Sequence, residues 1–338
     1  MDEPPPPGGL DDRESLLALV REARPHLSPI GPATDERLDL LEKQHDALHD
    51  LMESLLESDP QTAQEIAATL WRYWWLRDHM AEGRGFMERA ATIEGPDRAE
   101  ALSGLGTLAF RQGDTEEAER AFLERLPLVE RGGTPVDRAS AHTDLARIAL
   151  RRGDFTAVRS HAERGYAAAQ GDRQAIRMPL HLRAAAARME GRLDEARALY
   201  LESREINEAL GNLGNVAGED HNLVHVALHS NDREEAERRF RASSEWIFAN
   251  DNAYMRPYAI LDAGILALHD GDLERAGRLV ASAQRTFEDS DAIPDPDDRV
   301  ELDNAIARLE ELLGDRFAAV WAEGRGLSPA EAVTLARA

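Results

Sequence analysis

Apolar residues recur along the chain with the spacing of helices rather than of strands. Near the N-terminus, leucines stand three, four or seven positions apart, which places them on one face of a helix. That face comprises Leu38, Leu41, Leu48, Leu51 and Leu55. The pattern predicts amphipathic helices over residues 12–24 and 35–57.

A turn residue that tolerates a left-handed backbone recurs about every forty positions. These residues are Gly113, Gly153, Gly191, Asn231 and Gly271. An aspartate follows each of them except Gly191, which is followed by Arg192. An aspartate in this place can cap the helix that comes next. Because each turn separates two apolar segments, the pattern predicts a repeated helix-turn-helix unit.

Small residues flank each turn at fixed distances. Four positions before the turn the residue is always alanine, and five positions after it the residue is alanine or valine. Nine positions after the turn, larger residues predominate, namely Phe122, Ala162, Tyr200, Phe240 and Val280. Small residues let antiparallel helices approach closely, and large ones fill the space between neighbouring pairs. The predicted fold class is therefore all-α, a solenoid of stacked helix pairs.

The turn spacing and the Gly-Asp-x-x-x-Ala turn resemble tetratricopeptide repeats. Residues 42–51, 68–90 and 321–338 further resemble the C-terminal repeat region of large actinobacterial transcriptional regulators of the ATPase type. Those regulators carry an ATPase module and a DNA-binding module. This chain has neither a phosphate-loop motif nor a basic recognition helix, so neither activity is expected. The resemblance implies a fold and a role in protein interaction or regulation.

The predicted organisation is one solenoid preceded by a short tail. Residues 1–10, rich in proline and glycine, are expected to be disordered. Residues 11–338 are expected to form a single TPR-like, right-handed superhelical solenoid of about six to seven antiparallel helix pairs. Within it, residues 11–60 supply N-terminal helices, 61–290 the repeats and 297–338 C-terminal capping helices.

Two local features complete this prediction. Trp71, Trp74 and Trp75 fall in the first helix of an aromatic-rich unit, where tryptophan is expected to fill the core. Residues 290–298, with the sequence SDAIPDPDD, are expected to form a solvated loop.

Charge and composition exclude several classes of function. The formal net charge is −24 and the chain contains no cysteine. A strongly acidic chain repels nucleic acids and anionic membranes, and thiolate sites are excluded. No apolar run reaches the length of a membrane span, and the N-terminus does not read as a signal peptide. A cytoplasmic protein that binds neither nucleic acid nor membrane is the expectation.

Three histidines, His221, His225 and His229, stand four residues apart and form one stripe on a helix. At about 100° per residue, the stripe lies about 200° to 240° away from the alanine four positions before the turn. It should therefore point away from the partner helix of its own pair. In the tetratricopeptide family, such positions on the first helix line the inner, concave wall, where ligands bind.

Neighbouring repeats carry basic or aromatic residues that extend this face. The predicted ligand-binding set comprises His181, His221, His225, His229, His269, Arg147, Arg151 and Tyr258. Because this wall is basic to neutral in an acidic chain, the expected partner is an anionic protein or peptide, recognised through arginine and imidazole. The predicted function is a non-catalytic regulatory module, with the histidines spread along an open wall.

Other interpretations of the histidines stay open. His221 and His225 could share a metal ion with His181, or line a small-molecule site inside the concavity. His229 cannot join both of them, because eight residues span about 12 Å of helix. The histidines could also be tolerated polar surface residues, and the chain could self-associate. No catalytic motif is present, so catalytic residues and cofactors are not expected, although enzymatic activity is left open.

Overall fold

A computed structural model describes residues 10–27, 34–290 and 292–338 of the protein. These residues form α-helices and one short 3-10 turn, and no strand occurs among them, which confirms the predicted all-α class. None of the described helices is both long and apolar enough to span a membrane. Residues 1–9 lie outside the described part of the chain, so the disorder expected of the tail stays a prediction.

The contacts divide the chain into two compact units. Unit 1 comprises Met1–Phe110 and Asp114–Leu128, and unit 2 comprises Arg111–Gly113 and Val129–Ala338. The expectation of one solenoid over residues 11–338 stays a prediction.

Unit 1 consists of helices that surround a tryptophan-rich core. They are α1 (Leu10–Leu27), α2 (Thr34–Glu42), α3 (His45–Ser58), α4 (Pro60–Leu76), α5 (Met80–Ala90), α6 (Arg98–Arg111) and α7 (Thr115–Gly132), the last two being shared with unit 2 at their ends. The helix predicted over residues 35–57 is in fact two helices, broken at Lys43 and Gln44. Trp71 and Trp74 are 5% and 2% exposed, which confirms their core position.

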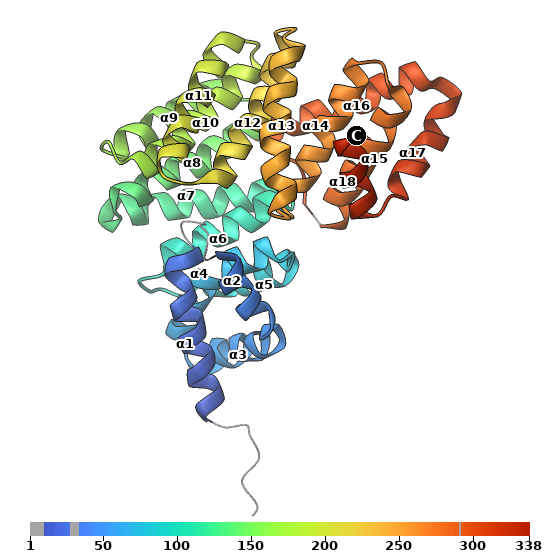
Figure 1. Ribbon diagram of the computed structural model, residues 1–338. Helices are drawn as coiled ribbons and strands as arrows, with labels where there is room; N and C mark the ends of the chain where they lie inside the picture. The colour runs from blue at the N-terminus through green and yellow to red at the C-terminus, as the bar shows by residue number, and fades with distance from the viewer. Residues whose placement is uncertain (1–9, 28–33, 291) are drawn as a thin grey trace, which may run out of the picture. The chain divides into compact units, whose positions relative to one another are not determined.

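Unit 2 holds the repeats that follow α7 as successive helix pairs (Figure 1). Its helices are α8 (Pro135–Arg151), α9 (Phe155–Ala168), α10 (Arg173–Met189), α11 (Leu193–Ala209), α12 (Leu213–His229), α13 (Arg233–Ala249), α14 (Arg256–His269), α15 (Leu273–Asp289), α16 (Pro296–Leu313), the 3-10 turn η1 (Gly314–Arg316), α17 (Phe317–Arg325) and α18 (Pro329–Arg337). Within each pair the two helices pack on one another, and α9, α11 and α13 also contact the pair that follows.

The turns between paired helices have the backbone that the sequence predicts. Gly153, Gly191 and Asn231 adopt positive φ angles of 70°, 74° and 58°. The Asp154 carboxylate caps α9 by accepting a hydrogen bond of 2.9 Å from the backbone N–H of Ala157. No side-chain hydrogen bond caps α11, whose N-cap residue is arginine rather than aspartate.

The close approach of paired helices leaves no room for a larger side chain at Gly264. A Cβ atom there would lie 2.8 Å from Val280 Cγ2 and 3.2 Å from Leu279 Cβ. We expect Gly264→Ala to lower the free energy of unfolding by about 1–3 kcal/mol, since overpacking forces neighbouring atoms to shift. Gly218→Ala is the matched control, because a Cβ there meets nothing within 4 Å. In urea unfolding, the free energy of unfolding of Gly218→Ala should exceed that of wild type by about 0.5–1 kcal/mol, because alanine is a better helix former than glycine.

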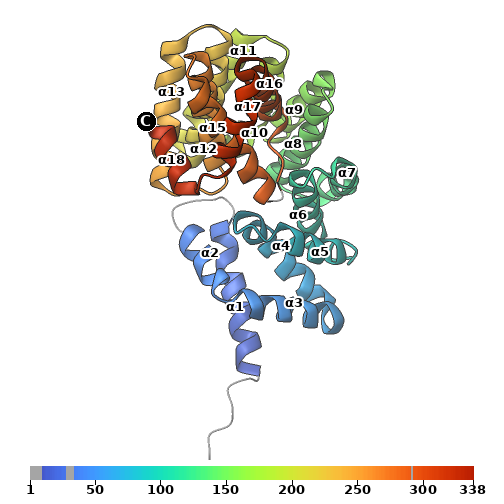
Figure 2. The same ribbon diagram turned by 90° about the vertical axis from the view of Figure 1, so that its right-hand side faces the viewer.

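Helix α16 packs against the first helices of the pairs rather than only closing the end of the stack. It contacts α8, α10 and α14, and Figure 2 shows it beside α10. The expectation of a solvated loop over residues 290–298 is therefore wrong in part. Asp297 and Asp298 are buried in the first turn of α16, and Asp291 lies outside the described residues. We call the sides of α8, α10, α12 and α14 that face α16 and the segment before it the inner face.

Candidate functional site

The histidine stripe of α12 faces α14 and α16 and is largely covered by them. His221 and His225 are 2% and 1% exposed, whereas the His229 side chain is 46% exposed. The expectation that these histidines line an open wall is therefore wrong for His221 and His225, because α16 lies over the part of the face that they occupy.

Asp262 of α14 joins the first two imidazoles. Its Oδ2 atom lies 2.7 Å from His221 Nδ1 in a hydrogen bond, and its Oδ1 atom lies 2.9 Å from His225 Nε2. Asp262 is fully buried. Histidines four residues apart stand one turn apart on α12, so one carboxylate from the adjacent inner helix can reach both rings.

Residues 292–301, here called the acidic strap, run along the inner face. At the start of the strap, the backbone N–H of Ile293 donates to the carbonyl of Arg111 at 2.9 Å. Asp295 Oδ2 lies 3.5 Å from Arg111 Nη1 and accepts a hydrogen bond from the Tyr254 hydroxyl at 3.0 Å. The side chains of the strap thus meet cationic and hydroxyl groups of the repeats.

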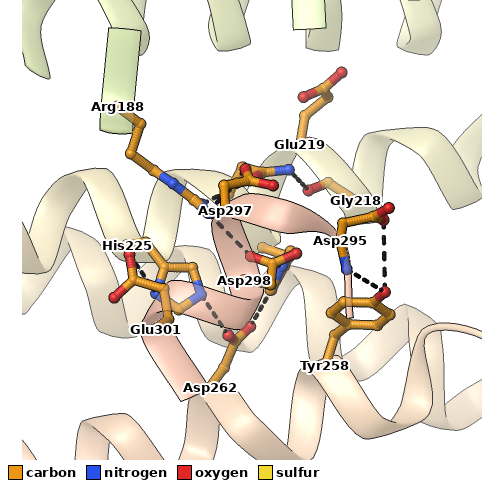
Figure 3. A network of polar contacts seen from close by, with 12 residues as sticks. Arg188, Gly218, Glu219, His225, Tyr258, Asp262, Asp295, Asp297, Asp298 and Glu301 are labelled. Carbon is orange, nitrogen blue, oxygen red and sulfur yellow. Dashed lines mark hydrogen bonds and ion pairs between the residues drawn. The ribbon is translucent and has the colours of Figure 1, made fainter. Parts of the chain in front are cut away.

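Arg188 of α10 is the cation at the centre of this contact (Figure 3). Its Nη2 atom lies 2.8 Å from Asp297 Oδ2 and 3.0 Å from Asp298 Oδ1. Its Nη1 atom donates to Asn222 Oδ1 at 2.9 Å. All of these side chains are buried, so the ion pairs act where water screens them little.

The same strap completes the surroundings of the histidine stripe. His221 Nε2 lies 3.3 Å from Asp298 Oδ1, and His229 Nε2 lies 2.8 Å from Glu301 Oε1. His225 Nδ1 is 3.9 Å from the same glutamate oxygen. We call His221, His225, Asp262, Asp298 and Glu301 the imidazole–carboxylate cluster.

The charges in this cluster shift its protonation equilibria. Burial opposes ionisation of Asp298, but the neighbouring His221 and Arg188 hold the pKa of Asp298 far below its usual range. Burial likewise opposes protonation of His221, yet Asp262 and Asp298 raise the pKa of His221 well above its usual value. The charges of His225 and Arg188 and the hydrogen bond from His229, acting against burial, lower the pKa of Glu301 to about 2. The carboxylates therefore stay ionised near neutral pH.

The other predicted site residues are spread over the inner helices. His181 Nδ1 binds Glu219 Oε2 at 3.0 Å instead of joining His221 and His225, so the three do not form a histidine metal site. His269 is half-exposed and lies 3.8 Å from an oxygen of its neighbour Asp270.

The predicted arginines and tyrosine lie near the start of the strap. Arg147 is 3.7 Å from Asp144. Burial lowers the pKa of Arg151 to about 10, against the attraction of Asp295. Tyr258 is buried instead of lining an open wall, and its ring meets His221 edge-on at 5.5 Å between centroids.

The sequence reasoning missed the residues that oppose the histidines. They are Arg188, Asp262, Asp295, Asp297, Asp298 and Glu301. The sequence contains a signal for this contact, since the acidic run PDPDD at residues 294–298 lies in the same chain as a wall that is predicted to be basic. Oppositely charged segments of one chain attract each other as the oppositely charged surfaces of two partners do.

A second histidine cluster lies within unit 1. His45 Nε2 and His49 Nδ1 lie 3.4 Å and 3.2 Å from the same oxygen of Glu82. The His79 ring stacks on His45 with centroids 4.0 Å apart, and its Nε2 atom lies 3.0 Å from Glu42. These side chains are partly exposed, so water screens their ion pairs.

His142 of α8 and His161 of α9 form a pair that should respond to acid. Their Nδ1 atoms are 3.4 Å apart. Burial is the main cause that lowers the pKa of both imidazoles, and the positive charge of Arg164 lowers both further. At His142 the charge of His161 also lowers the pKa, and Glu130 partly offsets these effects. The unfolded chain then binds protons more readily than the folded one, so stability is lost as pH falls below about 6.5.

We therefore expect His142→Gln/His161→Gln to gain stability relative to wild type as pH falls from 8 to 5. Urea unfolding of both proteins at several pH values measures this difference. A difference that is the same at pH 5 and pH 8 would contradict the assignment, because other titrating groups are common to both proteins.

Comparison with known families identifies the repeat. Residues 97–171 and 178–202 each match a family model described as tetratricopeptide repeat. These two segments carry tetratricopeptide repeats. This confirms the repeat type predicted from the turns at Gly113, Gly153 and Gly191, which lie within them. Comparison with curated proteins gives no match, and the resemblance to actinobacterial regulators stays a prediction.

Solved structures with the same fold support the solenoid. A Rap protein complexed with Competence and Sporulation Factor is 12% identical, with a TM-score of 0.58 and 96% of each chain covered. The Rap conjugation gene regulator of plasmid pLS20, in complex with the Phr* peptide, is 11% identical, with a TM-score of 0.56, covering 89% of this chain and 97% of that one. Aspartyl phosphate phosphatase F from Bacillus subtilis is 11% identical, with a TM-score of 0.53, covering 99% and 94%. At these identities the likeness concerns the fold alone.

Proposed function

We propose that the protein is a non-catalytic regulatory module whose inner face binds an acidic segment of a protein or peptide partner. The observation that carries this proposal is the acidic strap itself. Its carboxylates reach Arg188, His221 and His229 at distances of 2.8 to 3.3 Å. The inner face thus has the shape and charge to hold an extended chain followed by a helical turn that bears several carboxylates.

The strap acts in this proposal as a tethered competitor of the partner. A tethered segment has an effective concentration of the order of mM, so a partner must bind more tightly than the strap or act on a loosened strap. Regulation then consists of an exchange between two acidic segments on one basic surface. The Rap structure in complex with the Phr* peptide supports peptide binding as a use of this fold, and the Rap structure complexed with Competence and Sporulation Factor supports partner binding.

The test measures whether a loosened strap admits a free acidic peptide. A dye-labelled peptide with the sequence of residues 292–301, AIPDPDDRVE, is titrated with the full chain, and fluorescence anisotropy gives the Kd. The assay contains EDTA, so that metal ions play no part. We expect Asp297→Asn/Asp298→Asn to bind the peptide at least about tenfold more tightly than wild type, since the neutralised strap competes less well.

The matched control is Asp303→Asn. Asp303 also lies on α16, but its side chain is exposed and pairs with Arg299. This variant should bind the peptide as wild type does. A peptide with asparagine in place of its three aspartates should bind neither protein. Equal binding of the charged and neutral peptides, or no binding to the loosened variant, would refute the proposal.

A further inference from the structure

Among the described residues, one group of side chains has the spacing of metal ligands. His221, His225 and Asp298 each offer one ligand atom, and these atoms all lie within 4.8 Å of one another. Ligands of one tetrahedral zinc ion lie about 2.0–2.2 Å from it, and so about 3.3–3.6 Å from one another. The three atoms would therefore approach one another by up to about 1.5 Å on binding an ion.

The ring nitrogens in this group are available as ligands. His221 Nδ1 is hydrogen-bonded to Asp262, whereas its Nε2 atom is buried and makes no hydrogen bond. The ring nitrogens of His225 do not meet the geometry of a hydrogen bond, and its Nε2 atom contacts Asp262 Oδ1 as an ion pair at 2.9 Å. Both imidazoles are more than nine-tenths buried. Buried polar atoms normally make hydrogen bonds, whereas these nitrogens contact Asp298 and Asp262 as ion pairs without that geometry.

Asp262 has the place of an outer carboxylate in a metal site. Metal-ligating histidines usually donate their second N–H to a carboxylate, which fixes the orientation of the ring. The 2.7 Å hydrogen bond between His221 and Asp262 does this and directs Nε2 toward Asp298, 3.3 Å away. Glu301 lies close enough to His225 to serve as a further ligand, at 3.9 Å.

The charge balance of the interior also favours a cation. Asp262, Asp297, Asp298 and Glu301 are all buried, and the arginine that contacts this group is Arg188. If the imidazoles are neutral, the carboxylates outnumber the compensating charge. Buried charges are stable only when paired or when they coordinate a metal. Either protons on the histidines or a metal cation must neutralise the remaining negative charge.

We propose that His221, His225 and Asp298 bind a divalent transition-metal ion of the zinc class. Two imidazoles with carboxylate oxygen suit Zn²⁺, Co²⁺ or Ni²⁺, while Mg²⁺ and Ca²⁺ prefer an all-oxygen shell. The ion joins α12 to the first turn of α16, so metal binding fastens the acidic strap to the inner face. This inference does not rest on the proposed binding of an acidic partner.

The test uses the full chain, purified without a histidine tag and stripped with EDTA. Isothermal titration with ZnCl₂ should give one strong site per chain, and MgCl₂ should give none. Titration with CoCl₂ should change the visible absorption as nitrogen and oxygen ligands replace water. Hydrogen exchange should slow over residues 292–301 when Zn²⁺ is added, because the ion holds Asp298 in place.

Variants identify the ligands. We expect His225→Gln and Asp298→Asn to lower Zn²⁺ affinity more than tenfold, and Asp262→Asn to lower it by about 10–100-fold as an outer-shell change. His269→Gln is the control, since it removes a half-exposed histidine outside the group and should leave affinity unchanged. Circular dichroism shows whether each variant is folded. If a variant is not folded, the cobalt spectrum of wild type shows whether nitrogen and oxygen ligands of the protein bind the metal.

Two outcomes would overturn the proposal. One is zinc bound at well below one ion per chain, with no protection of the strap. The other is wild-type affinity in Asp298→Asn and His225→Gln. Either result means that protons on the imidazoles balance the carboxylates and that the group is a set of buried ion pairs.

Discussion

Arg188→Met should lower the free energy of unfolding of unit 2 by about 3–5 kcal/mol, because it leaves Asp297 buried without its cation and Asp298 with His221 alone. The guanidinium holds both carboxylates at 2.8 Å and 3.0 Å and is itself 5% exposed. Methionine keeps most of the length of the side chain, so the loss reports on charge rather than on a cavity. Hydrogen exchange in increasing urea and in the presence of EDTA, read over α10 and α16, measures this change in the free energy of unfolding.

Two further variants separate this effect from a general loss of an arginine. Arg159→Met removes a partly exposed partner of Glu190 and should cost less than about 1 kcal/mol. Adding Asp297→Asn and Asp298→Asn to Arg188→Met should restore much of the stability, since no unpaired buried charge then remains. If Arg188→Met costs no more than Arg159→Met, the inner face does not depend on this ion pair.

The repeats could be predicted from sequence because their signals are local. A residue such as Gly153 or Asn231 at the end of a helix indicates a left-handed turn without reference to the rest of the chain. The alanine before each turn has a fixed place on the helix, so its periodic return indicates a packed seam. The φ angles of 70° and 58° at these two residues match that reasoning.

The covering of the inner face could not be predicted in this way. Arg188 and Asp298 are 110 positions apart in sequence and meet only because α16 folds back onto the first helices. Periodicity states which side of α12 the histidines occupy, but it does not state what lies over that side. For this reason the sequence predicts that the stripe lines an open wall, whereas His221 and His225 are buried under the strap.

The burial of Asp297 and Asp298 could not be predicted from sequence for a related reason. Proline and aspartate are typical of solvated loops, and composition alone favours that interpretation. Aspartates leave water only where cations replace their hydration, and the cations here lie on other helices. Arg111 and Arg188 provide that replacement for Asp295, Asp297 and Asp298. A comparison of charge between segments, in addition to composition within each, would have indicated the contact.

In unit 1 the largest expected effect concerns Trp74. Its ring stacks on Phe86 with centroids 5.5 Å apart, and its Cγ atom would lie 2.6 Å from a Cβ at Gly83, so the indole is enclosed by α5. We expect Trp74→Ala to cost about 3–5 kcal/mol of unfolding free energy, since it removes buried ring contacts and leaves a cavity. Leu123→Ala, at a residue that is 53% exposed in α7, should change stability by less than about 0.5 kcal/mol. Hydrogen exchange in urea, read over α4 and α5, compares the two variants. A loss below about 1 kcal/mol in Trp74→Ala would mean that the helices close over the vacated space, because the cost of such a deletion depends on how far the site can collapse.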